Sequence, residues 1–487
     1  MTTPKSPSLL DAVIPVVTLI LLLALAVYLF GSDASSGPTQ IVLIVGAAVA
    51  ALIAIKNGHE WAELQTAMVS GIGTAMGAIL ILLAVGALIG TWLMSGTVPT
   101  LIYYGLELLN PRYFFVATCL ICAISALATG SSWTTAGTLG VALIGVAMGL
   151  SLSPAIAAGA VISGAYFGDK MSPLSDTTNL APAVAGTDLF THIRHMTWTT
   201  GPSFLIALVL YLVIGLGADV GADTVQLRGL MATLDESFNV TPVALLPLVV
   251  VFVFAMRKVP PLPTILFGAL LGGLVAVWLQ PQAVLAFADA GERTTTLAMI
   301  KGVWLALADG YVASTGVAEV DELLTRGGMS SMLTTIWLIL AALAFGAVLE
   351  HAGMLARLIQ GALKAAKSTG ALITTVVLSC IGINIVAADQ YIAIVLPGKM
   401  FQAEFQRRNL DPKNLSRILE DSGTLTSPLV PWNTCGAYMA ATLGVATFAY
   451  LPFAFLNLIN PLVSIFYGIT GISIKRLEPA VEPAAAA

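Results

Sequence analysis

The chain has 487 residues, of which 57% are hydrophobic and only 10% are charged, and its formal net charge is −5. Soluble domains carry roughly a quarter charged residues, so this composition excludes an ordinary soluble protein and indicates that lipid surrounds most of the chain. The small net charge and the lack of a basic run exclude nucleic acid as a partner. We therefore predict an all-α polytopic membrane protein that forms a single membrane domain over residues 1–487.

Apolar stretches long enough to cross a bilayer recur along the chain, from Leu9–Phe30 to residues 450–472. A hydrocarbon core of about 30 Å requires roughly 20 apolar residues per helix. The first stretch lacks a small-residue cleavage site, and we interpret it as a retained helix rather than a signal peptide. The lipid bilayer is therefore an expected partner of the chain.

Lysine and arginine residues at the ends of the spans indicate which loops are cytoplasmic. Lys5 places the N-terminus inside, and Lys56 returns the chain to the inside after the second span. Arg257 and Lys258 mark a later cytoplasmic loop, whereas the acidic loop of residues 218–239 is expected outside. The sequence predicts an integral protein of a bacterial inner membrane with both termini in the cytoplasm.

Residues 371–398 have basic residues on both flanks, so this segment is expected to enter and leave the membrane on the cytoplasmic face. The segment is too short for two crossings, and its middle is polar around Asp389 and Gln390. Irregular backbone at membrane depth is tolerated only where protein or a watery cavity surrounds it. We therefore predict a re-entrant hairpin whose tip lines a cavity. Residues 113–150 show the same pattern around a polar centre at residues 129–140.

Two parts of the chain resemble each other at an offset of about 255 residues, as the shared Ser-Pro-Leu at 172–174 and 427–429 illustrates. The charge rule gives the two parts opposite orientations. We therefore predict inverted repeats over residues 68–217 and 330–472, each with a re-entrant hairpin and a broken transmembrane helix. Residues 283–326 have a mixed character, and we assign no structure to them.

Two polar, proline-interrupted stretches, residues 168–181 and 419–438, predict an ion site. A carboxylate at the centre of a membrane helix costs about 2.5 to 3.5 kcal/mol on the insertion scale, which favours a functional reason for its presence. Proline frees backbone carbonyls, and together with hydroxyls and amides they provide hard oxygen ligands for an alkali cation. The alternative is an ordinary polar loop, but the repeated proline placement argues against it. The candidate ligands are Asp169, Ser172, Ser175, Asp176, Thr177, Thr178 and Asn179 in the first stretch, Asp421, Ser422, Thr424, Ser427, Asn433 and Thr434 in the second, and Ser131, Ser132, Asp389 and Gln390 at the hairpin tips.

A Na+ site is expected among Asp169, Asp176, Asp389 and Asp421, which the sequence does not rank. A carboxylate that holds either Na+ or a proton, and never both, would couple the movements of the two ions. Lys170 has two interpretations: it is an ion-pair partner that a cation displaces, or an anchor that reaches the membrane interface.

The sequence resembles the NhaC-type Na+/H+ antiporter family, part of a larger ion-transporter superfamily, in four motifs. These are TGSSWTTAGTLG (129–140), GDKMSPLSDTTNLA (168–181), AADQYIAIVLPGKMF (387–401) and LEDSGTLTSPLVPWNTCG (419–436). The motifs lie in both halves, so the resemblance covers nearly the whole chain, and it implies two re-entrant hairpins. It does not settle the substrate, because malate/lactate exchangers related to this family share the motifs.

These observations predict a secondary active transporter that exchanges cytoplasmic Na+ for external protons by alternating access, with no cofactor beyond the transported ions. The alternative is a Na+- or H+-coupled exchanger of small carboxylates of the malate or lactate type. The motifs contain no arginine, which favours cations as the transported substrates. The sequence leaves open whether the protein forms a homodimer. An enzyme is not expected: His59-Glu60 is followed by Glu63 rather than by the second histidine of a zinc-protease helix.

Overall fold

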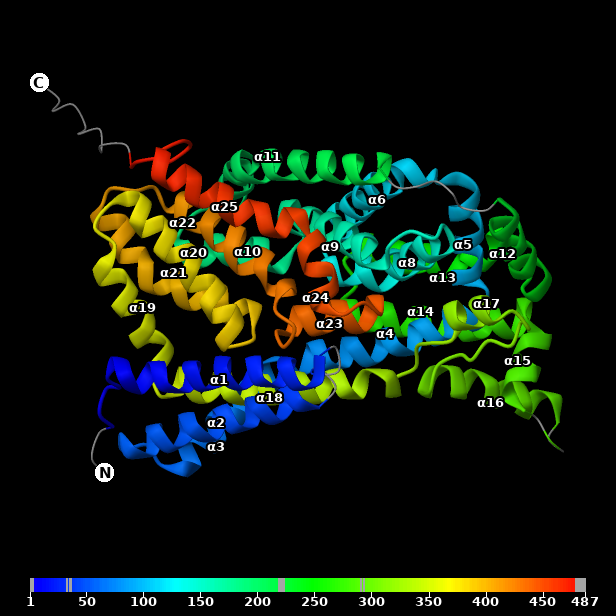
Figure 1. Ribbon diagram of the computed structural model, residues 1–487, viewed down its shortest axis with the longest axis horizontal. Helices are drawn as coiled ribbons and strands as arrows, with labels where there is room; N and C mark the ends of the chain where they lie inside the picture. Colours follow the sequence, from blue (N-terminus) through cyan, green and yellow to red (C-terminus); the bar gives the residue numbers. More distant parts are fainter. Residues whose placement is uncertain are drawn as a thin grey trace, which may run out of the picture.

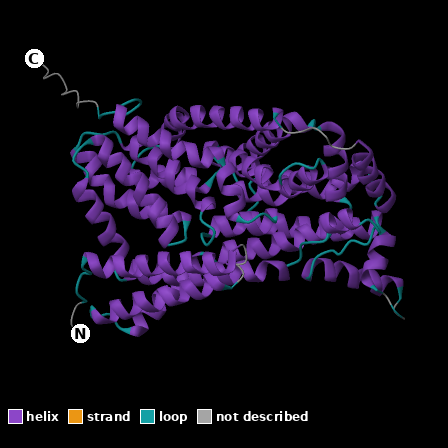
Figure 2. Cartoon of the chain, in the orientation of Figure 1, coloured by secondary structure: helices purple, strands orange, loops and turns teal. Residues whose placement is uncertain are grey.

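The computed structural model describes residues 4–31, 34, 37–217, 224–289, 291 and 294–477 (Figure 1). The predicted external loop of residues 218–239 is described only from residue 224 onward, and the end of the predicted cytoplasmic C-terminus lies outside the described residues. Helices provide the regular structure of the described part, and Figure 2 draws no strand in it. Two isolated β-bridges join Tyr311 to Arg326 and Leu410 to Arg476.

Nine helical segments of the described chain are long and apolar enough to cross a membrane, and two further helix pairs meet the same criteria with a sharp bend. The bends are 84° between Leu227–Ser237 and Pro242–Met256 and 89° between Thr434–Leu443 and Thr447–Phe453. The prediction of an all-α polytopic membrane protein with broken helices is confirmed. The nine segments are Leu9–Phe30 (α1), Pro38–Lys56 (α2), Met76–Met94 (α4), Pro111–Thr129, Ser132–Gly149, Leu189–Leu216 (α11), Pro261–Leu279 (α14), Ser330–His351 and Thr369–Val386 (α20).

The remaining helix labels include α6, α7, α8 and α18, which lie within three of these nine segments, and the short pieces on either side of each break. They are α3 (Trp61–Thr74), α5 (Thr97–Leu108), α6 (Phe114–Thr129), α7 (Ser132–Thr135), α8 (Val141–Gly149), α9 (Pro154–Met171), α10 (Asp176–Ala185), α12 (Thr224–Ser237), α13 (Leu246–Met256), α15 (Pro281–Ala288), α16 (Thr295–Ala308), α17 (Ala318–Leu324), α18 (Leu333–His351), α19 (Met354–Ala365), α21 (Gln390–Arg407), α22 (Pro412–Leu419), α23 (Thr434–Leu443), α24 (Thr447–Tyr450) and α25 (Phe455–Thr470).

The order of elements in the first half recurs in the second. In each half a 19-residue helix, α4 or α18, is followed by a left-handed glycine, Gly96 or Gly353, and then by a 12-residue helix. The next helix is interrupted in each half by a left-handed residue, Gly130 (φ 70°) or Ala388 (φ 58°), and these two lie 258 positions apart. Two parts of the sequence thus form the same succession of helices and breaks.

The predicted hairpin of residues 371–398 consists of two longer helices, α20 and α21, with 18 residues each. Pro397 lies inside α21 rather than ending it. At about 1.5 Å per residue each helix is about 27 Å long, close to the hydrocarbon thickness of about 30 Å. The turn between the two helices lies at Asp389, as expected. Re-entry of this hairpin from one membrane face stays a prediction. The opposite orientation of the repeats 68–217 and 330–472 stays a prediction as well.

The unassigned segment of residues 283–326 contains α16 and α17, and α16 packs against α4. A Cβ atom added at Gly90 of α4 would lie 2.1 Å from the carbonyl oxygen of Ala306 in α16, so only glycine permits this contact. Small residues allow such close backbone approach between membrane helices. The segment is therefore an integral part of the helix bundle.

The broken helices occupy the middle of the molecule. Figure 1 shows α9, α23 and α24 between α11 on one side and the layer of α1, α2 and α18 on the other. In agreement with this view, α18 packs on α2 and α3, and α9 packs on α6 and α25. Irregular backbone is enclosed by protein at these breaks, as membrane proteins require.

Candidate functional site

Each half presents an interrupted helix whose second piece begins with a capping side chain. Ser131 caps α7 by accepting a hydrogen bond from the amide of Thr134 at 3.1 Å. Asp389 caps α21 by accepting one from the amide of Ile392 at 2.9 Å. The left-handed residue before each cap turns the chain sharply, so both polar tips are fixed by local structure.

The break between α9 and α10 is held together by several of the predicted ligands. The Ser172 hydroxyl donates to the carbonyl of Leu127 at 2.9 Å, and the Thr178 hydroxyl donates to the carbonyl of Lys170 at 3.0 Å. The Asn179 amide donates to the carbonyl of Pro173 at 3.0 Å. These side chains satisfy backbone groups that the broken helix leaves unpaired.

Ser175 and Thr177 also belong to this break. The Ser175 hydroxyl caps α10 and lies 3.2 Å from the Thr177 hydroxyl. Both side chains are buried. We therefore assign most polar residues of this stretch a bracing role, with Asp169 and Asp176 as its carboxylates.

The second break is built differently, from a π-helix over Glu420–Thr424 followed by a turn of 3-10 helix at Ser427–Leu429. The Ser427 hydroxyl donates to the side-chain oxygen of Gln390 at 2.8 Å. The Asn433 side chain caps α23 and donates to the side-chain oxygen of Asn384 at 3.1 Å. These bonds tie the second break to the α20–α21 turn.

A cavity of about 340 Å³ collects polar tips from both halves. Three of the four predicted aspartates line it, Asp169, Asp176 and Asp389, and no lysine or arginine is found among its lining residues in the described chain. The other predicted ligands that line it are Ser131, Ser132, Gln390 and Thr434.

Asp169 presents one occupied and one free oxygen in this cavity. Its Oδ2 atom accepts hydrogen bonds from the Ser132 hydroxyl at 2.6 Å and the Ser132 amide at 3.1 Å. Its Oδ1 atom is buried and has no hydrogen-bond partner among the described residues. A buried carboxylate oxygen without a donor is a position that a cation or a proton can occupy.

Asp176 and Asp389 differ in their surroundings. Asp389 is buried and spends one oxygen on capping α21, whereas Asp176 is exposed at the cavity wall. Asp176 accepts hydrogen bonds from the Tyr391 hydroxyl and, at 2.8 Å, from the amide of Thr177. The bond to Tyr391 crosses from the first half of the chain to the second.

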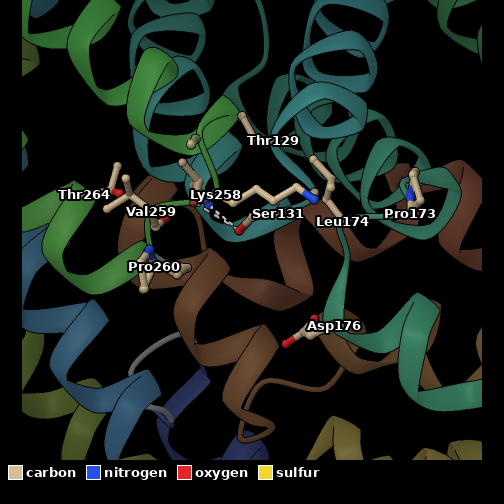
Figure 3. Close-up of a pocket in the computed structure, with 13 residues that line it drawn as sticks. Thr129, Ser131, Pro173, Leu174, Asp176, Lys258, Val259, Pro260 and Thr264 are labelled. Carbon is tan, nitrogen blue, oxygen red and sulfur yellow. Dashed lines mark hydrogen bonds between the residues drawn. The ribbon is translucent and has the colours of Figure 1, made fainter. Parts of the chain in front are cut away.

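A second cavity of about 390 Å³ adjoins the first and shares Gly130, Ser131, Asp176 and Pro261 with it. Its remaining wall includes the turn before α14, where Lys258 lies. Figure 3 shows Lys258, Ser131 and Asp176 around this space, which is contributed by the first half and by the α13–α14 turn. The two cavities together connect the Lys258 turn, which is expected to be cytoplasmic, with the aspartates.

Asp421, the fourth predicted aspartate, is not in the cavity lining. Its Oδ1 atom accepts from the Lys170 ammonium at 2.5 Å and from the Thr199 hydroxyl at 3.0 Å, and both members of the ion pair are 0% exposed. The Arg417 guanidinium lies 4.0 Å from the other oxygen. Lys170 is therefore a buried ion-pair partner and not an interfacial anchor.

Ser422 and Thr424 accompany Asp421 on the π-helix and are buried away from the cavity. The Ser422 hydroxyl donates to the carbonyl of Ile418 at 2.6 Å. Adjacent residues thus face different sites: Asp169 faces the cavity, and Lys170 faces Asp421. The roles of Asp421, Ser422 and Thr424 as ion ligands stay predictions.

Glu420 is a residue that the sequence analysis missed. It is fully buried, and neither of its carboxylate oxygens has a hydrogen-bond partner in the described part of the chain. Lys170 and Asp169 act on it electrostatically, so it is near both residues. Its position beside Asp421 in the polar stretch of residues 419–438 was the signal that could have identified it.

Comparisons with known proteins show which family this chain resembles. A model of the Na+/H+ antiporter family matches residues 164–472, which include both broken stretches. The chain is 42% identical over 437 residues to the Na+/H+ antiporter NhaC of Alkalihalophilus pseudofirmus, covering 90% of this chain and 91% of that protein.

Two other relatives carry different names. The malate-2H+/Na+-lactate antiporter of Bacillus subtilis is 39% identical over 437 residues, covering 89% of this chain and 90% of that protein. The arginine/ornithine antiporter ArcD of Halobacterium salinarum is 36% identical over 486 residues, covering 98% of this chain and 95% of that protein. Proteins similar over their whole length thus bear the names of ion and of organic substrates.

Proposed function

This chain belongs to the Na+/H+ antiporter family, and from that premise we propose that it exchanges cytoplasmic Na+ for external protons by alternating access. We place it in the bacterial inner membrane with both termini in the cytoplasm, where Lys5 and Lys56 would lie. Na+ and protons are its cargo, and the proposal requires no cofactor. The proposal leaves its assembly as monomer or homodimer open.

The single observation that carries this proposal is the composition of the 340 Å³ cavity. Three carboxylates and several hydroxyl or amide oxygens line it without a counterbalancing lysine or arginine from the described residues. Hard cations prefer oxygen ligands, and negative charge in a protein-walled site attracts them strongly. The cavity is therefore suited to bind Na+ or protons.

Asp169 is the proposed point of competition between the two ions. One of its oxygens is held by Ser132, and the other is free and buried. A proton or a Na+ ion on that oxygen neutralises the same charge, so the two exclude each other. Ser131 and Asp389 at the hairpin tips would supply further oxygens.

The exchange is tested in proteoliposomes that contain the purified protein and a pH-sensitive dye. A Na+ gradient should drive a change of luminal pH, whereas a K+ gradient of the same size serves as control. The reversal potential then gives the ratio of Na+ to protons. A luminal pH that does not respond to Na+ would contradict the proposal.

A small organic substrate is the second candidate, favoured by the cavity volume and by the names of the two other relatives. A volume of about 340 Å³ exceeds what a single Na+ ion needs. A malate- or lactate-type anion would meet three carboxylates there, which disfavours it unless Na+ or protons neutralise them first. Counterflow of labelled malate, lactate or arginine in the same proteoliposomes separates this candidate from simple ion exchange.

A further inference from the structure

A cluster of two histidines and one glutamate lies outside the cavities already described. His59 belongs to the turn between α2 and α3, Glu63 to the first turn of α3, and His351 is the last residue of α18. One ligand atom from each residue lies within 4.8 Å of the other two. The packing of α18 on α2 and α3 brings together residues that are almost 300 positions apart.

The three side chains lie in close proximity. The Nδ1 atom of His59 lies 3.7 Å from the carboxylate of Glu63, and the rings of His59 and His351 meet edge to face with centroids 5.4 Å apart. In a tetrahedral zinc site with bonds of about 2.0 to 2.1 Å, neighbouring ligand atoms are about 3.3 Å apart. Glu63 and His351 are exposed, so small rotations of their side chains can close the remaining distance.

The Nδ1 atom of His59 supports this reading. It is buried, and because its 3.7 Å separation from the Glu63 carboxylate is too long for a hydrogen bond, it has no hydrogen-bond partner among the described residues. A buried ring nitrogen without a partner is costly, and a metal ion would satisfy it. The nearest lysine in sequence, Lys56, pairs with Asp11 at 2.8 Å, so its charge is already engaged by that carboxylate.

We propose that His59, Glu63 and His351 form a binding site for a borderline divalent transition-metal ion, of which Zn2+ is the model, separate from the cation cavity. Imidazole nitrogens select this class of ion over Na+, Mg2+ and Ca2+, which prefer oxygen ligands. Two histidines and one glutamate leave a fourth coordination position open to water. The bound ion would fasten the α2–α3 turn to the end of α18.

The test uses the full chain in detergent, purified without a histidine tag, and Co2+ as a spectroscopic probe. We expect one Co2+ ion per chain, seen by its visible absorption bands and displaced by Zn2+. His59→Ala and His351→Ala should each weaken Co2+ binding by at least roughly 10- to 100-fold. That is the usual loss when a residue that only orients a metal ligand is removed. Glu63→Gln should weaken binding and yet preserve the helix cap, because glutamine also serves at this capping position.

The control is His195→Ala, which removes one of the chain's two other histidines and should leave Co2+ affinity unchanged. His351→Gln replaces His351→Ala if the latter does not elute as a folded monodisperse protein. Co2+ binding that survives both histidine substitutions, or that falls equally with His195→Ala, would overturn the proposal. So would the absence of any saturable binding by the unsubstituted chain.

Discussion

The cavity and the buried ion pair beside it use the same residue types in opposite ways. Asp169, Asp176 and Asp389 gather three negative charges around open space with no lysine or arginine among the described lining residues. Next to it, Lys170 and Asp421 neutralise each other without any exposure to solvent. The uncompensated charge around open space fits the proposal that the first region binds the cargo ion. The balanced charge in the packed interior fits a second region that holds the broken helices together.

Among the substitutions that test this comparison, Asp421→Asn is expected to have the largest effect on stability and exchange. It leaves the Lys170 ammonium buried without its partner, and breaking a buried pair costs about 3 to 5 kcal/mol. Thermal unfolding in detergent should therefore begin at a much lower temperature, and exchange should be lost. The double variant Lys170→Met with Asp421→Leu should recover part of the stability, because replacement of a whole buried pair is often neutral, whereas the buried Arg417 guanidinium still loses its neighbouring carboxylate. A stable Asp421→Asn protein would show that the pair does not brace the fold.

Asp169→Asn should abolish Na+-dependent proton movement and change stability little. Asparagine keeps an oxygen that can accept from Ser132 but removes the charge that Na+ and protons share. The measurement is dye-detected exchange in proteoliposomes together with thermal unfolding. Asp188→Asn is the control, since Asp188 is an exposed cap of α11 and asparagine caps equally well. Normal exchange by Asp169→Asn would remove this residue from the ion site.

Tyr391→Phe should change Na+ affinity moderately. The substitution removes the hydroxyl that donates to Asp176 and so frees a carboxylate oxygen for a cation. A hydrogen bond to a charged group contributes about 1.5 to 3 kcal/mol, which corresponds to a roughly tenfold or larger decrease of the KM for Na+. Initial exchange rates measured against Na+ concentration test this, with Tyr28→Phe on the exposed face of α1 as control. A KM equal to that of the control would place Asp176 outside the binding path.

Ser172→Ala should affect stability alone. Its hydroxyl ties the α9–α10 break to the carbonyl of Leu127 in the last turn of α6, and loss of such a bond costs about 1 kcal/mol. The unfolding temperature should fall slightly, and the KM for Na+ should stay the same. A large change of KM would instead make Ser172 an ion ligand, as the sequence analysis had allowed.

The sequence identified the positions of the breaks because their determinants are local. Ser131, Ser175, Asp389 and Asn433 are capping residues, and each lies at the start of the helix piece where the polar motifs place it. A cap depends on the next three residues, so it can be recognised without tertiary structure.

The direction in which each side chain points could not be read from the sequence. Asp169 and Lys170 are neighbours, yet they contact residues 37 positions before and 251 positions after them, respectively. The buried position of Glu420 depends likewise on packing between distant segments. The same holds for the segment of residues 283–326, whose mixed character did not indicate that Ala306 of α16 lies against Gly90 of α4.

The contact between Gly90 and Ala306 bears on which elements move during transport. The carbonyl oxygen of Ala306 occupies the space that a side chain at position 90 would fill. The two helices α4 and α16 therefore cannot slide past each other without collision. We expect them to travel as one body, so that any rocking takes place at the interrupted helices. A cysteine crosslink between α4 and α16 should accordingly leave exchange intact, whereas a crosslink that spans the two interrupted helices should stop it.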